Sequence, residues 1–170
     1  LENKSASVLD FMGFAQKGGS VLSFVRLAED AAALNQVRID VQQADAVLGC
    51  DVVVAASPEA LQTIRHGRTQ LLVNVHEIPV AEAVHNPDAD LRLPLLLDKL
   101  RFAAGPERVR TLDAQALAED FLGDSIYSNI VALGHAWQLG LVPVSLAAMQ
   151  RAIELNAVAV EANRAAFSLG

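Results

Sequence analysis

Three short stretches hold glycines and polar residues of the kind that bind anions. The first is a glycine-rich loop with a lysine. The second is a serine–proline pair typical of a helix start, and the third is an asparagine that closes an apolar run. A glycine-rich loop and the free amides of a helix N-terminus can together hold a phosphate or a carboxylate. We therefore predict a cofactor-binding site made of Gln16, Lys17, Gly18, Gly19, Ser20, Ser57 and Asn74.

Each of these residues also has an ordinary structural explanation. Gly18-Gly19 can form a sharp turn before a strand, and Lys17 can be a solvated side chain. Ser57 can cap a helix and do nothing more, and Asn74 can be a turn residue. The prediction of a site therefore depends on the convergence of these residues at one edge of a sheet.

The histidines, the cysteine and the carboxylates form no recognisable catalytic or metal-binding motif. The four histidines are about nine or more residues apart, so none has the i, i+4 spacing of a helical metal pair. The only cysteine, Cys50, cannot form an internal disulfide or supply a four-thiolate cluster, and we expect it to be an inert core thiol. Because no Walker loop, nucleophile elbow or complete dinucleotide fingerprint is present, we predict no catalytic and no metal-ligating residue.

The composition is that of a folded domain with a substantial core. Of the 170 residues, 52% are hydrophobic and 19% are charged, which excludes a disordered chain. The formal net charge of -7 argues against non-specific binding to nucleic acid. No apolar run approaches the roughly 18 residues of a membrane span and no signal peptide is visible, so we predict a cytoplasmic protein without membrane contact. Because the first residue is Leu1, we expect the chain to start within a longer protein.

The hydrophobic pattern alternates between strand-like and helix-like segments. The expected strands are residues 5–11 (buried), 21–27 (half-buried), 36–42, 51–56 (the strongest), 69–74 and 108–112. The expected helices are residues 44–49, 57–66, 95–104, 113–122, 125–139, a helix capped by Ser145, and residues 156–169. This order predicts an α/β fold with a Rossmann-like, mainly parallel sheet flanked by helices, and an all-helical C-terminal part.

The predicted boundaries are a sheet domain over residues 1–123 and a helical extension over residues 124–170, packed on the same domain. Ligands of open parallel sheets bind outside the carboxyl ends of the strands. The loop 13–20, Ser57 and Asn74 each follow an expected strand, so a parallel sheet would bring the three to one edge.

Several segments, taken in order, match the motifs of a known family. They are residues 10–26 (DFMGFAQKGGSVLSFVR), 44–48 (ADAVL), 55–61 (AASPEAL), 128–134 (SNIVALG) and 163–170 (NRAAFSLG). Together they resemble the gamma domain of 2-oxoacid:ferredoxin oxidoreductases, and most closely the indolepyruvate:ferredoxin oxidoreductase type. The resemblance spans nearly the whole chain.

This resemblance implies an accessory role in a larger oxidoreductase. Such enzymes oxidatively decarboxylate a 2-oxoacid to an acyl-CoA with thiamine diphosphate, and they pass electrons through iron–sulfur clusters to ferredoxin. The resemblance implies that the thiamine-binding and cluster-binding residues lie on partner domains or subunits. It also implies that this domain helps to hold coenzyme A and docks through its helical tail and apolar surface. The net charge and the lack of a long apolar run give the further expectation of no nucleic-acid and no membrane partner. Homo-oligomer formation is left open.

One departure from the family pattern leaves two alternatives. The family opens with a glycine-rich strand–turn–helix, whereas nothing precedes Leu1 here, so residues 1–4 are expected to end the helix that follows that loop. A free-standing Rossmann-type dehydrogenase is the first alternative, although it needs a complete phosphate loop and an acidic ribose ligand. A purely structural assembly module without a ligand is the second.

Overall fold

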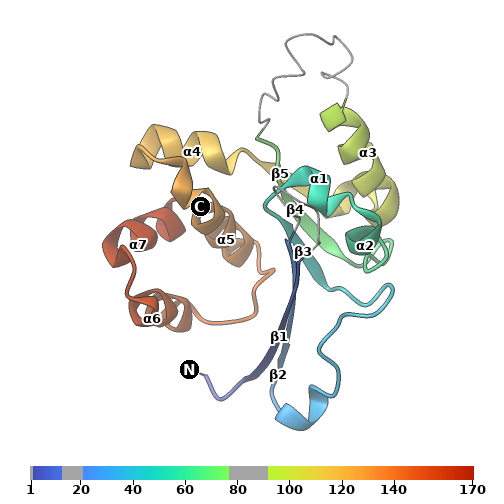
Figure 1. Ribbon diagram of the computed structural model, residues 1–170, viewed down its shortest axis with the longest axis horizontal. Helices are drawn as coiled ribbons and strands as arrows, with labels where there is room; N and C mark the ends of the chain where they lie inside the picture. Colours follow the sequence, from blue (N-terminus) through green and yellow to red (C-terminus); the bar gives the residue numbers. More distant parts are fainter. Residues whose placement is uncertain (1, 13–20, 77–91) are drawn as a thin grey trace.

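A three-stranded parallel sheet in the order β3-β4-β5 lies between two layers of helices (Figure 1). The computed structural model describes residues 2–12, 21–76 and 92–170. The sheet strands are β3 (Ala46–Gly49), β4 (Gln70–Asn74) and β5 (Val109–Leu112). A separate antiparallel ribbon consists of β1 (Ser5–Met12) and β2 (Val21–Ala28). The predicted α/β class, with a parallel sheet flanked by helices and a helical C-terminal part, is confirmed.

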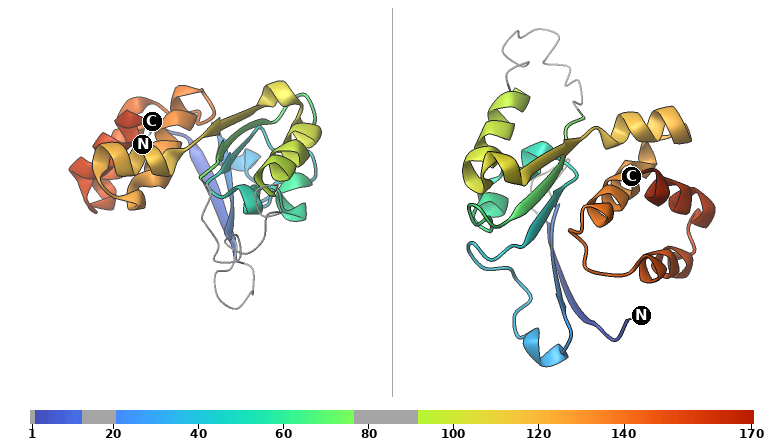
Figure 2. Two further views of the ribbon diagram at one scale, coloured as in Figure 1. Left: turned by 90° about the horizontal axis from the view of Figure 1, so that it is seen from above. Right: turned by 180° about the vertical axis from the view of Figure 1, so that it is seen from behind.

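Helices α1, α2 and α3 cover one face of the sheet, and α4 to α7 lie on the other side (Figures 1 and 2). The helix bounds are α1 Val52–Ala55, α2 Pro58–Leu61, α3 Arg92–Ala104, α4 Ala114–Leu122, α5 Ser128–Gln138, α6 Leu146–Asn156 and α7 Val160–Leu169. Short 3-10 turns occupy Ala31–Ala33, Pro106–Arg108 and Ser125–Tyr127. No helix in the described part of the chain is both long and apolar enough to cross a membrane.

Strand β4 is the centre of the apolar core. Leu71, Leu72 and Val73 are at most 1% exposed, and successive side chains of a strand point to opposite faces. Leu71 and Val73 pack in a cluster with α1 and α3, while the neighbouring β3 residue Leu48 packs in a second cluster with α4, α5 and α7. A strand buried on both faces carries an uninterrupted apolar run, here residues 71–73, which is why residues 69–74 were recognisable as a strand.

The structure reverses two adjacent predictions between residues 44 and 56. Residues 44–49, predicted as a helix, contain β3, which pairs with β4 from Ala46 to Gly49. Residues 51–56, predicted as the strongest strand, contain helix α1. The Asp51 carboxylate accepts the amides of Val53 and Val54 at 2.7 and 3.0 Å, so a capped helical turn forms despite three valines. Short apolar runs do not distinguish a strand from a buried helix by pattern alone.

Two further predictions were wrong in extent. Residues 36–42 contain no strand. Helix α2 starts after Ser57 as predicted but ends at Leu61 rather than near residue 66. The carbonyl groups of Gln62 and Thr63 accept amides from Gln42 and Ala44, so they bond to the segment that leads into β3 instead of continuing the helix.

Residues 5–11 form a strand as predicted, but this strand is not buried. β1 and β2 pair in register from Ser5 with Ala28 to Met12 with Val21, and Val8 is 61% exposed. Residues 2–4, expected to be helical, are irregular. They hold the ribbon to the α5–α6 loop, because Glu2 accepts the Ser145 amide and Lys4 donates to the Pro143 carbonyl.

Helix caps explain the boundaries of the C-terminal half. Asp113 accepts the Ala116 amide at the start of α4, and Gly123 ends that helix with a φ of 76°. Ser145 accepts the Ala148 amide at the start of α6, as its position before the helix predicts. Residues 125–139 start as a 3-10 turn before α5, and the last helix begins at Val160 rather than at residue 156. The division into units at residues 123 and 124 stays a prediction.

Helix α6 is the peripheral element of this half, and it buries no residue. One ion pair joins it to α7, between Glu154 and Arg164, and Glu154 also pairs with Arg151 of its own helix. The hydrogen bond from Arg151, together with the charges of both arginines, holds the pKa of Glu154 below its ordinary value. A carboxyl group whose pKa is lowered in the folded state stabilises that state at pH values above its ordinary pKa. The contribution of Glu154 to the stability is therefore lost as the pH falls through the lowered pKa.

Gly134 lets α5 and α7 touch, which generates a prediction about stability. A Cβ at this position would lie 2.0 Å from the Phe167 carbonyl oxygen, a backbone atom that cannot turn away. We expect Gly134→Ala to lower the free energy of unfolding by about 3 kcal/mol in chemical denaturation, as overpacking does. Gln138→Ala, at an exposed position of the same helix, is the control and should change it by less than about 0.5 kcal/mol. An unchanged midpoint for Gly134→Ala would contradict the observed helix contact.

Candidate functional site

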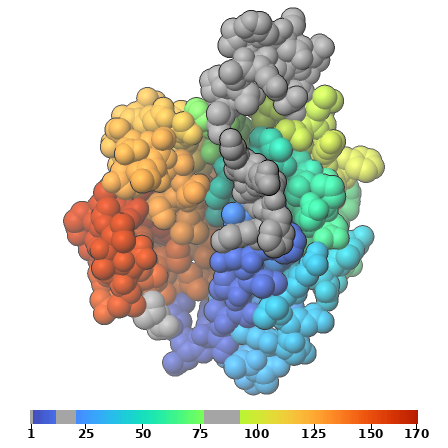
Figure 3. Space-filling model, viewed as in Figure 1, coloured from blue at the N-terminus to red at the C-terminus, as the bar shows by residue number. Residues whose placement is uncertain are grey.

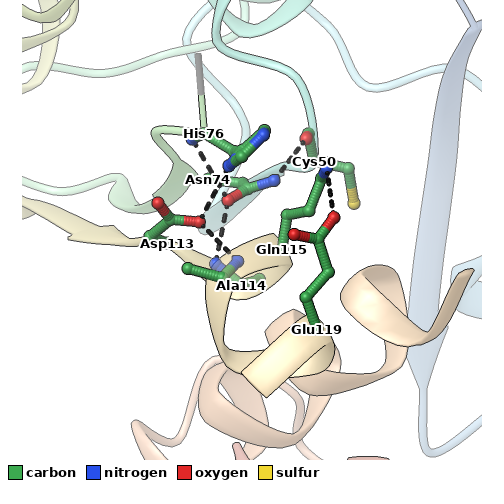
Figure 4. Close-up of polar contacts among 8 residues, drawn as sticks. Cys50, Asn74, His76, Asp113, Ala114, Gln115 and Glu119 are labelled. Carbon is green, nitrogen blue, oxygen red and sulfur yellow. Dashed lines mark hydrogen bonds and ion pairs between the residues drawn. The ribbon is translucent and has the colours of Figure 1, made fainter. Parts of the chain in front are cut away.

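The carboxyl ends of the three parallel strands bring polar residues from distant parts of the sequence together (Figure 4). Cys50 follows β3, Asn74 is the last residue of β4, and Asp113 follows β5. Ligands bind at this edge in open parallel sheets. We therefore take it as the candidate site, called here the carboxyl edge, consisting of Cys50, Asp51, Asn74, His76, Asp113, Gln115 and Glu119.

Asn74 connects all three strands through its amide. Its Nδ2 donates to the Cys50 carbonyl at 3.3 Å, and its Oδ1 accepts the Ala114 amide at 3.0 Å. The same oxygen lies 3.4 Å from the His76 amide nitrogen, which also donates to it. In Figure 4 the side chain lies between the end of β3 and the start of α4. Its polar groups are therefore already engaged within the fold.

Asp113 and His76 form a pair beside Asn74. The Asp113 Oδ1 accepts the Ala116 amide at 2.8 Å and lies 3.2 Å from the His76 Nδ1. The His76 side chain is 24% exposed and that of Asp113 is 45% exposed. The pair becomes an ion pair when the imidazole is protonated, and Asp113 orients the ring in either case. Chemically, this histidine can exchange a proton or bind a polar group at the edge of the sheet.

On the first turns of α4, Gln115 donates from Nε2 to the Glu119 Oε1 at 2.8 Å. This is an i, i+4 contact on one face of the helix. Figure 4 shows the pair on the Cys50 side of Asn74. The contact holds the Glu119 carboxylate at the carboxyl edge.

Cys50 is exposed at the end of β3 rather than buried in the core, so that part of its prediction was wrong. The surrounding atoms nevertheless desolvate its thiol, and this effect raises the pKa of Cys50, with a smaller contribution from the neighbouring Asp51 carboxylate. A thiol with a raised pKa is mostly protonated at neutral pH and is a poor nucleophile. The expected low reactivity of Cys50 therefore follows from the raised pKa of its thiol and not from a position in the core.

The described carboxyl edge is acidic and has few free amides. Asp51 and Asp113 already accept the first amides of α1 and α4, which satisfies the donors that a phosphate would otherwise use. Glu119 adds a third carboxylate, and His76 is the basic side chain in this set. An anion at this edge would need a cation from residues outside the described part, where the predicted Lys17 lies.

The predicted site residues have three different outcomes. Asn74 lies at the carboxyl edge as expected. Ser57 does not follow a strand, because residues 52–55 are helical. It sits between α1 and α2, and its hydroxyl accepts the Ala60 amide at 3.3 Å as a helix cap. Gln16, Lys17, Gly18, Gly19 and Ser20 lie outside the described residues, so their role stays a prediction.

Sequence reasoning overlooked His76 and Asp113 as members of the site. Asp113 was placed at the start of a predicted helix, residues 113–122, and it caps that helix. The rule that ligand sites follow parallel strands also applies to residues 108–112, and applied there it would have selected Asp113. No comparable signal exists for His76, because its role depends on the contact with Asp113, 37 residues away.

No group of three or more His, Cys, Asp or Glu side chains that could hold a metal ion occurs among the residues that the structure describes. The described donor set therefore does not fit an iron–sulfur cluster, which requires several thiolates, whereas the chain has one cysteine.

Comparison with known proteins supplies the family context of this fold. The family model described as pyruvate ferredoxin/flavodoxin oxidoreductase matches residues 1–170. A search of individually curated proteins finds no significant match.

The Asn74 contacts generate a prediction about the edge. We expect Asn74→Ala to lower the free energy of unfolding by about 2 kcal/mol, because it leaves partners at the ends of β3 and α4 without hydrogen bonds. Asn35→Ala, at an exposed asparagine outside the sheet, is the control and should be nearly neutral. Urea denaturation measures both. Equal effects of the two substitutions would show that Asn74 does not join the strands.

The Cys50 environment generates a second prediction. The rate of alkylation by iodoacetamide should rise with pH to a midpoint above that of an unperturbed thiol, and the single cysteine makes the reaction site-specific. Asp51→Asn should lower the midpoint without abolishing the shift, since desolvation is the larger cause and asparagine still caps a helix. Ser23→Ala, on the ribbon, is the control and should leave the profile unchanged. A midpoint at or below the ordinary value would contradict the desolvated thiol.

Proposed function

Because the chain belongs to the pyruvate ferredoxin/flavodoxin oxidoreductase family along residues 1–170, we propose that it is the gamma domain or subunit of a 2-oxoacid:ferredoxin oxidoreductase of the indolepyruvate type. The complete enzyme of this family uses thiamine diphosphate and iron–sulfur clusters. In the proposal it decarboxylates the 2-oxoacid oxidatively to an acyl-CoA and passes the electrons to ferredoxin. This chain has an accessory role there, in assembly and in holding coenzyme A.

What supports the accessory role is the combination of family membership with the donor set of the chain. Clusters require several cysteine thiolates, and the chain has one, with a thiol whose pKa is raised. At the described carboxyl edge, the best-placed proton carrier is His76, and its neighbour Asp113 is already a helix cap. The bond-breaking groups then belong to the thiamine-binding domains or subunits, which are the proposed partners.

Coenzyme A carries phosphates, so its binding needs cations or free amides. The described carboxyl edge offers few of either, because its carboxylates already occupy the helix amides. We therefore assign the coenzyme A contact to Gln16, Lys17 and the glycines and serine of residues 13–20, with Ser57 in a capping role. Asn74 supports the strand ends through the contacts that use its amide.

A purely structural assembly module is the second candidate function. It is favoured by the engagement of both Asn74 and Ser57 in contacts that hold the fold together. A free-standing dehydrogenase has less support, since the sequence lacks a complete phosphate loop.

The coenzyme A assignment gives a prediction for the complete enzyme. Lys17→Ala should raise the KM for coenzyme A about tenfold, as loss of one phosphate contact does, and leave the KM for the 2-oxoacid unchanged. Gln16→Ala should raise the same KM by a smaller factor. Lys99→Ala, at an exposed position of α3, is the control for loss of a positive charge and should change neither constant.

Steady-state kinetics with ferredoxin as electron acceptor measures these constants. Unchanged coenzyme A kinetics in both loop variants would favour the structural module. Decarboxylation of an arylpyruvate by this chain alone would overturn the accessory role. Tight NAD binding in calorimetry would instead favour the dehydrogenase.

A further inference from the structure

The antiparallel register of the β1–β2 ribbon sorts its residues onto two faces. Val8 stands opposite Val25, and Asp10 stands opposite Ser23. Cross-strand partners share a face, and alternate residues along each strand share it too. The face that contains these pairs, called here the outer face, comprises Ala6, Val8, Asp10, Val21, Ser23, Val25 and Leu27. The inner face comprises Ser5, Ser7, Leu9, Phe11 and their partners.

The two faces differ in burial. On the inner face Phe24 is 5% exposed, and the Arg38 guanidinium lies 5.8 Å from the centre of its ring. On the outer face every residue is exposed. The exposed fractions of its large apolar side chains are 61% for Val8, 52% for Val21, 51% for Val25 and 37% for Leu27. Figure 3 shows the two strands, in blue, at the surface of the molecule.

This arrangement is unusual for a ribbon that functions alone. A two-stranded hairpin is marginally stable in water unless an apolar face is covered. The segment around Arg38 covers the part of the inner face near Phe24, and the Arg26 guanidinium donates to the Arg38 carbonyl, whereas Phe11 at the end of β1 is 54% exposed. A row of β-branched residues on the other face then has no folding role within the described chain, and contiguous exposed apolar side chains mark interaction surfaces.

The charge on the outer face indicates the chemistry of what covers it. Asp10 is its single ionisable residue among the described positions, and its Oδ1 accepts the Ser23 hydroxyl at 2.6 Å. No ion pair of Asp10 occurs among the contacts of the described residues. A carboxylate in the middle of an apolar surface is stabilised on burial only when a cation meets it. The complementary surface is therefore apolar and carries an arginine or lysine opposite Asp10.

The same charge argues against a second copy of this chain as the occupant. A two-fold pairing of outer faces about an axis parallel to the strands would bring the two Asp10 carboxylates to the same level without a cation from this face. Each chain also carries a net charge of -7, which adds long-range repulsion. A different polypeptide fits better.

We infer that the outer face of the β1–β2 ribbon docks onto the thiamine diphosphate-binding part of the same oxidoreductase, against an apolar surface with an arginine or lysine opposite Asp10. This inference rests on the proposed function, which supplies the partner. The ribbon is then an arm that holds this domain to the part of the enzyme where the chemistry takes place.

The test uses this chain and the thiamine diphosphate-binding part of the enzyme, mixed and followed by sedimentation velocity. Val8→Lys and Val25→Lys should each weaken the association at least about tenfold, because a lysine would be desolvated in an apolar contact. Asp10→Lys should weaken it as well, by repulsion between like charges. Val53→Lys, on α1 with a wild-type exposure of 62%, is the matched control and should bind as the wild type does.

The outcomes separate the inference from its premise. If the wild-type chain binds and the ribbon variants bind equally well, the docking face is wrong while the proposed function stands. If the wild-type chain does not bind the thiamine diphosphate-binding part at all, the result contradicts the proposed function, on which the inference rests. Self-association of the isolated chain that Val8→Lys abolishes would make a second copy the occupant and overturn the inference. Circular dichroism checks that each variant is folded. If Val8→Lys does not fold, Asp10→Asn takes its place in the test. This variant keeps an acceptor for Ser23 and should weaken binding severalfold, because it removes the charge that the partner's cation meets.

Discussion

The burial of β4 on both of its faces is the constraint on which the rest of the structure depends. Leu71 and Val73 need an apolar cover on one side and Leu72 needs one on the other. The chain meets both needs by placing α1 and α3 on the first side and α4, α5 and α7 on the second. The crossovers then return each strand in the same direction, so that β3, β4 and β5 are parallel and end at a common edge.

That common edge is closed by side chains rather than left open as a nest of amides. Asp51 and Asp113 begin the helices that follow β3 and β5, and Asn74 spans the gap between them from the end of β4. Each of these side chains compensates for backbone groups that strand and helix ends would otherwise leave unpaired. The result is an acidic platform whose strand and helix ends are already hydrogen-bonded. Such a platform positions a loop or a partner well and holds an anion poorly by itself.

Local signals in the sequence were sufficient for some parts of this fold and insufficient for others. The start of α6 was identified from Ser145 and that of α4 from the pattern of residues 113–122, because Ser145 and Asp113 act within their own helices. The exchange of helix and strand between residues 44 and 56 could not be foreseen, because pairing with β4 selects Ala46–Gly49 and because α1 passes so close to Gly49 that a Cβ there would lie 2.8 Å from Ala55. The pair of His76 and Asp113 depends on the same tertiary pairing.

Helix α6 adds a different property to the C-terminal half. It buries no residue and is joined to α7 by the ion pair between Glu154 and Arg164. The link between α6 and α7 passes through Ala157 and Ala159, both with positive φ. Detaching it exposes little apolar surface, so this helix opens by itself at a small fraction of the free energy that unfolds the sheet. Its amides therefore exchange with solvent deuterium through brief local openings. Met149 of α6 lines a shallow apolar groove together with Ile130 and Leu133 of α5, so the same openings separate the two walls of that groove.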